Sequence, residues 1–284
     1  MTKSASIFFI TGLTLLLSSA PVSADTVTFA QFTEAGGGGN DFNFVSSTNS
    51  ATFSSRNPKT GSSIVPVYFD FLSFAATDLP LDLQGPQAAQ LTFSVTTTQN
   101  AVTFGNFFDQ NLYSQSASGV PNYGTIKFTR DTPDHELGQT NLLTVSFWAT
   151  AGGLDGIRKG QTATLSADNG QTDYVQFSSS YLNFDPQSDE NLALSFTSAT
   201  PCFTVYANVK SAKGGCTQTS SAVLNFLHSF TAAGTGTFAS DPSPTSVFAV
   251  PEPGTNWLTL LGATGIGMLL LRRSRRSPVA EVSK

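Results

Sequence analysis

Histidine and charged side chains are scarce in this chain of 284 residues. It holds 2 His, and Asp, Glu, Lys and Arg together make up 12% of the residues. His135 lies in the charged loop Arg130 to Glu136, and His228 alternates with apolar residues in a segment that resembles the edge of a core. Because histidine is the side chain most often used to move protons near neutral pH, few positions are suited to general acid–base catalysis.

Motifs of common catalytic classes are also missing. The sequence contains no Gly-x-Ser-x-Gly elbow, no His-Glu-x-x-His and no P-loop, and Gly36 to Gly39 lacks the following Lys and Ser/Thr that bind phosphate. A glycosidase with two carboxylates stays open, because its residues need no proximity in sequence. We predict that the protein is not an enzyme, and we assign no catalytic residue.

Basic residues are few, which excludes one class of partner. The chain has a net charge of −5, and residues 25–249 hold 8 Lys and Arg against 17 Asp and Glu. Nucleic-acid binding requires a basic face that neutralises phosphates. We therefore expect no nucleic-acid partner.

Cysteine is limited to Cys202 and Cys216. In an exported chain two cysteines can pair across a turn, here Ser211 to Gly215, and closing that loop restricts the unfolded chain by about 3 kcal/mol. A zinc site requires more ligands than two cysteines. We predict a disulfide between them and no metal site or cofactor. Calcium is the one ion left open, because Asp168–Asp173 and Asp185–Glu190 gather oxygen donors; a hairpin turn and a solvated loop explain these segments better.

The body of the chain alternates with a period of two. Runs rich in Val, Phe, Thr and Tyr are separated by turns rich in Gly, Asn, Asp and Pro, and 24 of the residues are Phe. This pattern predicts about a dozen strands and an all-β fold over residues 25–240, an antiparallel sandwich of the jelly-roll or immunoglobulin-like type. We expect Trp148 in the core and Asp168-Asn169-Gly170 in a hairpin turn. We also expect strands at Cys202–Val209 and Ala222–Phe230, a loop at Gln110–Gly124, and a Pro/Ser linker at residues 241–249.

The N-terminus has the features of a secretory signal peptide. Lys3 precedes the apolar run Ile7–Leu17, and Val22-Ser23-Ala24 provides the small residues that signal peptidase accepts. We predict that residues 1–24 are removed by cleavage between Ala24 and Asp25.

The C-terminal segment, residues 250–284, combines three features in a fixed order: a proline-rich clip, an apolar span and a basic cluster. The apolar span of residues 256–271 predicts one transmembrane helix. As a helix its 16 residues span roughly 24 Å, which is short of the hydrocarbon core until flanking arginines snorkel outward. The clip consists of Val250, Pro251, Glu252 and Pro253; Trp257 and Leu271 bound the span; and the basic cluster contains Arg272, Arg273, Arg275 and Arg276.

This tail resembles the PEP-CTERM sorting signal of Gram-negative envelope proteins. The resemblance implies that exosortase, a membrane protease-transpeptidase, processes the chain near Pro251-Glu252-Pro253, and it implies an exopolysaccharide or biofilm setting. It also implies passage through the inner membrane to the cell surface or the extracellular matrix. We therefore expect a structural or adhesive protein of the envelope or matrix. A carbohydrate-binding module or glycan-active enzyme, and a permanently tail-anchored protein, are the alternatives.

Overall fold

The folded part of the chain is built from strands. A computed structural model describes residues 26–35, 39–72, 79, 81–133, 138–170, 172–186, 188–212 and 215–244. Within these ranges, no helix has both the length and the apolar character needed to cross a membrane. The predicted all-β, antiparallel class is confirmed.

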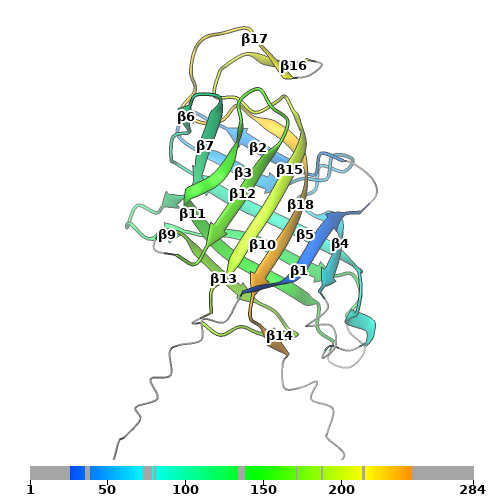
Figure 1. The fold of residues 1–284 in the computed structure, drawn as a ribbon. Helices are drawn as coiled ribbons and strands as arrows, with labels where there is room; N and C mark the ends of the chain where they lie inside the picture. Colours follow the sequence, from blue (N-terminus) through cyan, green and yellow to red (C-terminus); the bar gives the residue numbers. More distant parts are fainter. Residues whose placement is uncertain are drawn as a thin grey trace, which may run out of the picture.

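One sheet of 13 strands forms the body of the domain, and two-stranded ribbons surround it (Figure 1). The strands are β1 (Val27–Glu34), β2 (Phe42–Ser46), β3 (Ala51–Ser55), β4 (Val65–Phe71), β5 (Gln87–Thr97), β6 (Val102–Phe104), β7 (Phe107–Leu112), β8 (Ser114–Gln115), β9 (Pro121–Asn122), β10 (Gly124–Arg130), β11 (Asn141–Ile157), β12 (Ala163–Asp168), β13 (Tyr174–Ser178), β14 (Leu182–Asn183), β15 (Asn191–Thr200), β16 (Val209–Ala212), β17 (Gly215–Gln218), β18 (Phe230–Ser240) and β19 (Ser243–Pro244). A short 3-10 helix, η1, covers Leu81–Leu83.

The order of paired strands can be followed from β1 through five other strands and back to β1. From β1 it runs through β4, β5, β3, β2 and β18 and back to β1. Along its opposite edge β5 pairs with β10, and along its opposite edge β18 pairs with β15. Buried residues of the remaining strands belong to the same hydrophobic core. The finer expectation of a jelly-roll or immunoglobulin-like sandwich is not confirmed, because these strands share one continuous sheet.

Phenylalanine fills the interior. Strand β18 alternates between buried and less buried residues along its length, as expected of a strand with one face on the core. Phe53 lies near the centre, with its ring centroid 5.0 Å from that of Phe93 and 4.9 Å from that of Phe196. A bulge in β1 between Thr28 and Ala30 breaks the alternation, so that Phe29 and Ala30 are both fully buried. Large aromatic side chains of this kind each bury much apolar surface, so the phenylalanines contribute strongly to the stability of the core.

Several local expectations were wrong. Residues 202–208 and 224–229 form irregular segments with one isolated bridge, between Tyr206 and Val223, instead of strands. The expected loop at 110–124 contains the end of β7 and the ribbon of β8 and β9. The Asp168-Asn169-Gly170 turn does not join a paired hairpin, because β12 pairs with β11 and β15 while β13 pairs with β11.

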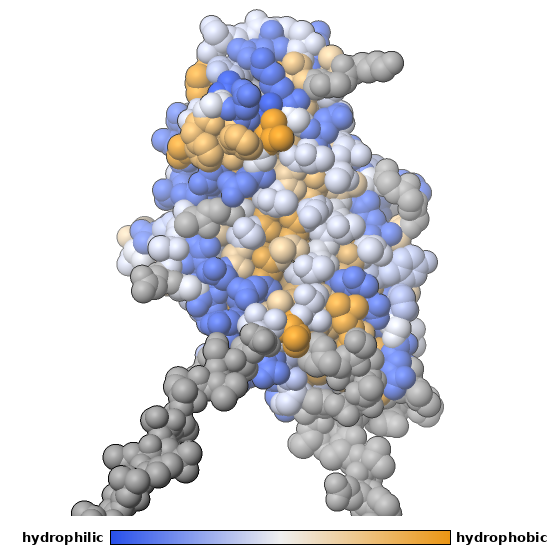
Figure 2. Space-filling view, in the orientation of Figure 1, coloured by the Kyte–Doolittle hydropathy of each residue, from blue (hydrophilic) through white to orange (hydrophobic). Residues whose placement is uncertain are grey.

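Strand β11 is the longest of the sheet at 17 residues. Its first half pairs with β10 and β13, and its second half pairs with β12 and β7. The change of partners falls next to Trp148, which is the last residue paired with β13. Seen from outside, the domain is mostly hydrophilic or intermediate, with an apolar area over β6 and β7 (Figure 2).

Candidate functional site

Four aromatic side chains gather on the outer face of the sheet around Trp148; we call them the aromatic platform. Trp148 in β11 lies directly opposite Tyr174 in β13, and their rings stack with centroids 4.7 Å apart. Tyr123, just before β10, lies 5.1 Å from Trp148 and 5.0 Å from Tyr174. Tyr113, between β7 and β8, meets Trp148 edge-on at 6.2 Å. The platform thus joins residues from distant parts of the sequence.

The position of Trp148 corrects the sequence-based expectation of a core residue. Val145, Phe147 and Ala149 are fully buried, while Trp148 alternates with them and is only partly buried. The side chains of a strand point to opposite faces in turn, so Trp148 points out of the sheet. Tyr123 is 48% exposed, which makes it the most open member of the platform.

Hydrogen-bonding groups border the aromatic rings. The hydroxyl of Tyr174 donates to Gln176 Oε1 at 2.6 Å, and the amide of Gln115 donates to the Tyr113 hydroxyl. Burial, then the nearby Tyr123 and Glu190, raises the pKa of Tyr174. Its hydroxyl therefore stays protonated and able to donate at neutral pH.

A polar row runs beside the platform across strands β10, β11 and β13. Ser146 in β11 lies opposite Thr125 in β10 and Gln176 in β13. Thr125 and Gln176 are exposed. Open aromatic rings next to amides and hydroxyls provide an apolar contact and directional hydrogen bonds together, the combination that recognises a polar ring carrying C–H groups.

The carboxylate next to the platform is already engaged. Asp173 is 8% exposed, and its Oδ1 accepts hydrogen bonds from the Thr150 backbone N–H at 2.8 Å and from the Thr150 hydroxyl at 3.1 Å. It therefore fixes the chain beside Tyr174 rather than facing outward.

A pair of carboxylates lies further along β11, and sequence reasoning did not single it out. Asp109 in β7 and Asp155 in β11 are cross-strand partners. Burial, followed by the charges of Asp155 and Asp173, raises the pKa of Asp109 to about 6. Burial also raises the pKa of Asp155. Only the pairing of the strands brings these two residues together, so no local motif could have revealed them.

Two carboxylates of the oxygen-rich turns weighed for calcium accept hydrogen bonds from the protein itself. Asp173 binds Thr150, and Glu190 is 4% exposed and accepts the Phe177 N–H at 2.7 Å. Burial raises the pKa of Glu190 to about 7. Over the described residues, no group of three or more His, Cys, Asp or Glu side chains could hold a metal ion.

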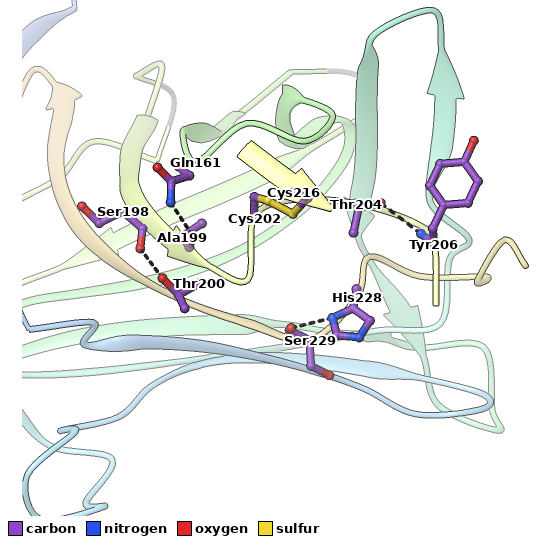
Figure 3. The surroundings of a disulfide bond; sticks show 10 residues. All are labelled: Gln161, Ser198, Ala199, Thr200, Cys202, Thr204, Tyr206, Cys216, His228 and Ser229. Atoms are coloured by element: carbon purple, nitrogen blue, oxygen red, sulfur yellow. Dashed lines mark hydrogen bonds between the residues drawn. A yellow bond between two sulfur atoms is a disulfide. The ribbon is translucent and has the colours of Figure 1, made fainter. Parts of the chain in front are cut away.

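One histidine, His228, lies in the surroundings of the two cysteines (Figure 3). Cys202 and Cys216 form a disulfide that ties strand β17 to the segment after β15. The ring of His228 is half-buried and its Nδ1 lies 2.9 Å from the Ser229 carbonyl oxygen. His135 falls outside the described residues.

The predicted sorting and processing residues also fall outside the described part of the chain. They are the cleavage site between Ala24 and Asp25, the clip of residues 250–253, the apolar span of residues 256–271 and the basic cluster of residues 272–276. The described chain ends at Pro244 in β19, which pairs with β14 through Leu182.

Comparison with known proteins identifies a motif in the C-terminal tail. Residues 249–276 match the family model of the PEP-CTERM protein-sorting motif. No curated protein and no solved structure matches the chain. The sorting motif implies export by way of the membrane and processing by exosortase.

Proposed function

We propose that this chain, which carries a PEP-CTERM sorting motif, is an adhesive protein of the cell surface or extracellular matrix. In this proposal its β-domain binds polysaccharide through the aromatic platform. The sorting motif supports the route of export. The gathering of Tyr113, Tyr123 and Tyr174 around Trp148 supports the activity, because a structural scaffold has no need to expose such a cluster.

The geometry favours a neutral sugar polymer as the ligand. Aromatic rings contact the C–H face of a sugar ring, and the amides and hydroxyls of Thr125, Ser146 and Gln176 suit its hydroxyl groups. The acidic character of residues 25–249, with 17 Asp and Glu against 8 Lys and Arg, disfavours a strongly anionic polymer.

Binding fits the site better than hydrolysis. Glycoside hydrolysis requires two carboxyl groups on either side of the scissile bond. Asp173, next to Tyr174, is buried and bonded to Thr150. We therefore assign no catalytic residue, metal or cofactor to the proposed activity.

Affinity electrophoresis of the exported chain in gels that contain protein-free exopolysaccharide from the host tests this function. Trp148→Ala and Tyr123→Ala should each weaken binding by about tenfold, because a stacked aromatic contact contributes on the order of 1 kcal/mol beyond the area it buries. Tyr68→Ala is the matched control, since Tyr68 and Tyr123 are both 48% exposed and Tyr68 lies on β4, away from the platform. Equal mobility of wild type and the Trp148→Ala variant would disprove the site.

The intact mass of the mature protein tests the route. Loss of residues 272–276 from the mature chain supports processing at the clip. A mature chain that keeps these arginines is permanently tail-anchored, and the sorting part of the proposal then fails while the binding part stands.

A further inference from the structure

A second surface feature lies away from the platform, on the β6–β7 hairpin and the end of β11. Four apolar side chains there form what we call the apolar patch: Val102 is 54% exposed, Phe104 56%, Phe107 52% and Ile157 51%. Phe107 is the cross-strand partner of both Phe104 and Ile157, so these three make one row across three strands. The patch lies in the orange area over β6 and β7 in Figure 2. Adjacent apolar side chains of this size on a folded surface indicate an interaction site.

The hairpin that carries the apolar patch is held in place by Arg158. The Arg158 backbone N–H donates to the Asn106 carbonyl oxygen at 2.8 Å. Its guanidinium donates to the Gly105 carbonyl oxygen at 2.9 Å and to the Tyr206 hydroxyl at 3.1 Å, and it lies over the Tyr206 ring. A surface fixed in this way loses little conformational entropy when a partner binds.

Opposite charges flank the apolar row. Asp109 and Asp155 lie two residues from Phe107 and Ile157 along their strands and are cross-strand partners. On the other side, β11 ends at Ile157 and the chain turns at the exposed Lys159. Along the end of β11 and the turn that follows it, the order is therefore acidic, apolar and basic.

We propose that a second copy of this chain docks on the apolar patch, about a two-fold axis that runs along the row of Phe104, Phe107 and Ile157. Rotation about this axis reverses the strand direction of the second copy. Each Lys159 then faces the acidic pair of the other copy, and the two apolar rows meet at the centre. A two-fold interface must be self-complementary, and this order of charges meets that condition.

The surroundings of the apolar patch favour a second copy over a lipid surface. An anionic membrane leaflet would repel Asp109 and Asp155, which border the patch. The described chain ends at β19, at the opposite end of the domain from the β6–β7 hairpin (Figure 1). The patch therefore stays accessible to another copy when the C-terminal end is directed toward the envelope.

Dimerisation would also strengthen the proposed function. A dimer presents two aromatic platforms to one polymer, and the second contact then forms at high effective concentration. This consequence rests on polysaccharide binding, whereas the dimer itself does not.

Sedimentation velocity of the exported chain across a range of concentrations tests the dimer with a charge swap. Wild type should dimerise, and Asp155→Lys and Lys159→Glu should each raise the dimer dissociation constant by about tenfold or more, because like charges then oppose each other. The double variant should dimerise nearly as well as wild type, since its swapped charges are again complementary. A wild type that stays monomeric, or a double variant no better than the singles, would overturn the proposal.

Two further measurements keep the test decisive. If Asp155→Lys lowers the thermal unfolding midpoint, a second experiment replaces the charge swap. Isotope-labelled and unlabelled wild-type chains are mixed and coupled with carbodiimide. A hybrid-mass amide between Lys159 and Asp109 or Asp155 supports the interface, and same-chain coupling alone contradicts it.

Phe104→Ser should abolish dimers but leave binding of a short, monovalent oligosaccharide unchanged. Loss of oligosaccharide binding by Trp148→Ala with intact dimers separates the two proposals.

Discussion

The indole of Trp148 and the phenol ring of Tyr174 stack across two neighbouring strands, with their planes 16° apart and their centroids separated by 4.7 Å. Both side chains lie on the outer face of the sheet, while Phe147 and Val175, their neighbours in sequence, are buried in the core. The protein thus places a stacked aromatic pair where it contributes little to the interior. This arrangement is the structural basis for proposing a ligand.

Intrinsic fluorescence should report directly on that pair. The chain has 2 Trp, so Trp257→Phe leaves Trp148 as the single indole. Addition of host polysaccharide should shift its emission to shorter wavelengths and protect it from acrylamide quenching, because a sugar ring would exclude water from the indole. Tyr174→Ala in the same background should remove most of the shift. If polysaccharide slows the protein in affinity gels but leaves the Trp148 emission unchanged, the binding site lies elsewhere.

Gly236 in β18 should tolerate no side chain. A Cβ at this position would lie 2.3 Å from Leu194 Cδ2 and 2.6 Å from Phe32 Cε1, both within the core. Gly236→Ala should therefore lower the free energy of unfolding by about 1–3 kcal/mol through overpacking. Thr237→Ala, at an exposed position of the same strand, is the control and should change it by less than about 0.5 kcal/mol. Chemical denaturation measures both, and equal stability of the two variants would contradict the packing described here.

Removal of the disulfide should destabilise the end of the domain near β16 and β17. Cys202 and Cys216 are separated by 14 positions, and opening a loop of that size costs about 3 kcal/mol on the chain-entropy model. The Cys202→Ala/Cys216→Ala variant should unfold at lower urea concentration than wild type and should not respond to reductant, whereas wild type should. A wild type whose midpoint is the same with and without reductant would show that the bond does not contribute.

The fold class could be predicted because one signal repeats along the whole chain. Alternation in segments such as Leu91–Val95 identifies strands without any knowledge of their partners. The pairing order could not be predicted, because it joins distant segments: β1 pairs with β18, more than 200 positions later. Segments 202–208 and 224–229 contain residues with strand propensity, but they lie in the irregular region around the disulfide, where tertiary contacts override that propensity.

Only one feature of the aromatic platform could have been predicted from the sequence: the outward orientation of Trp148. Val145, Phe147 and Ala149 are buried, and side chains alternate between the two faces of a strand. Trp148 must therefore face outward, which the alternation in the sequence already indicated. The expectation of a core position assigned Trp148 to the wrong face of its strand. The proximity of Tyr113, Tyr123 and Tyr174 depends on strand pairing, and no pattern within the chain revealed it.

Glu190 should make the stability of the domain depend on pH. Its pKa is raised from 4.5 to about 7, chiefly by burial, while the hydrogen bond from the Phe177 N–H acts in the opposite direction. Between these two pH values the folded state binds more protons than the unfolded state, so stability falls as the pH rises. Glu34, whose pKa burial also raises to about 7, adds to the same trend.

Glu190→Gln isolates the contribution of that one carboxyl group. Glutamine can still accept the Phe177 N–H through its amide oxygen but cannot ionise, so the variant should match wild type near pH 4.5 and exceed it in stability above pH 7. Asp189→Asn, at an exposed neighbouring position, controls for the change in net charge. Urea unfolding across this pH range measures the effect. A difference between Glu190→Gln and wild type that stays constant from pH 4.5 to pH 8 would show that Glu190 does not titrate within the folded domain.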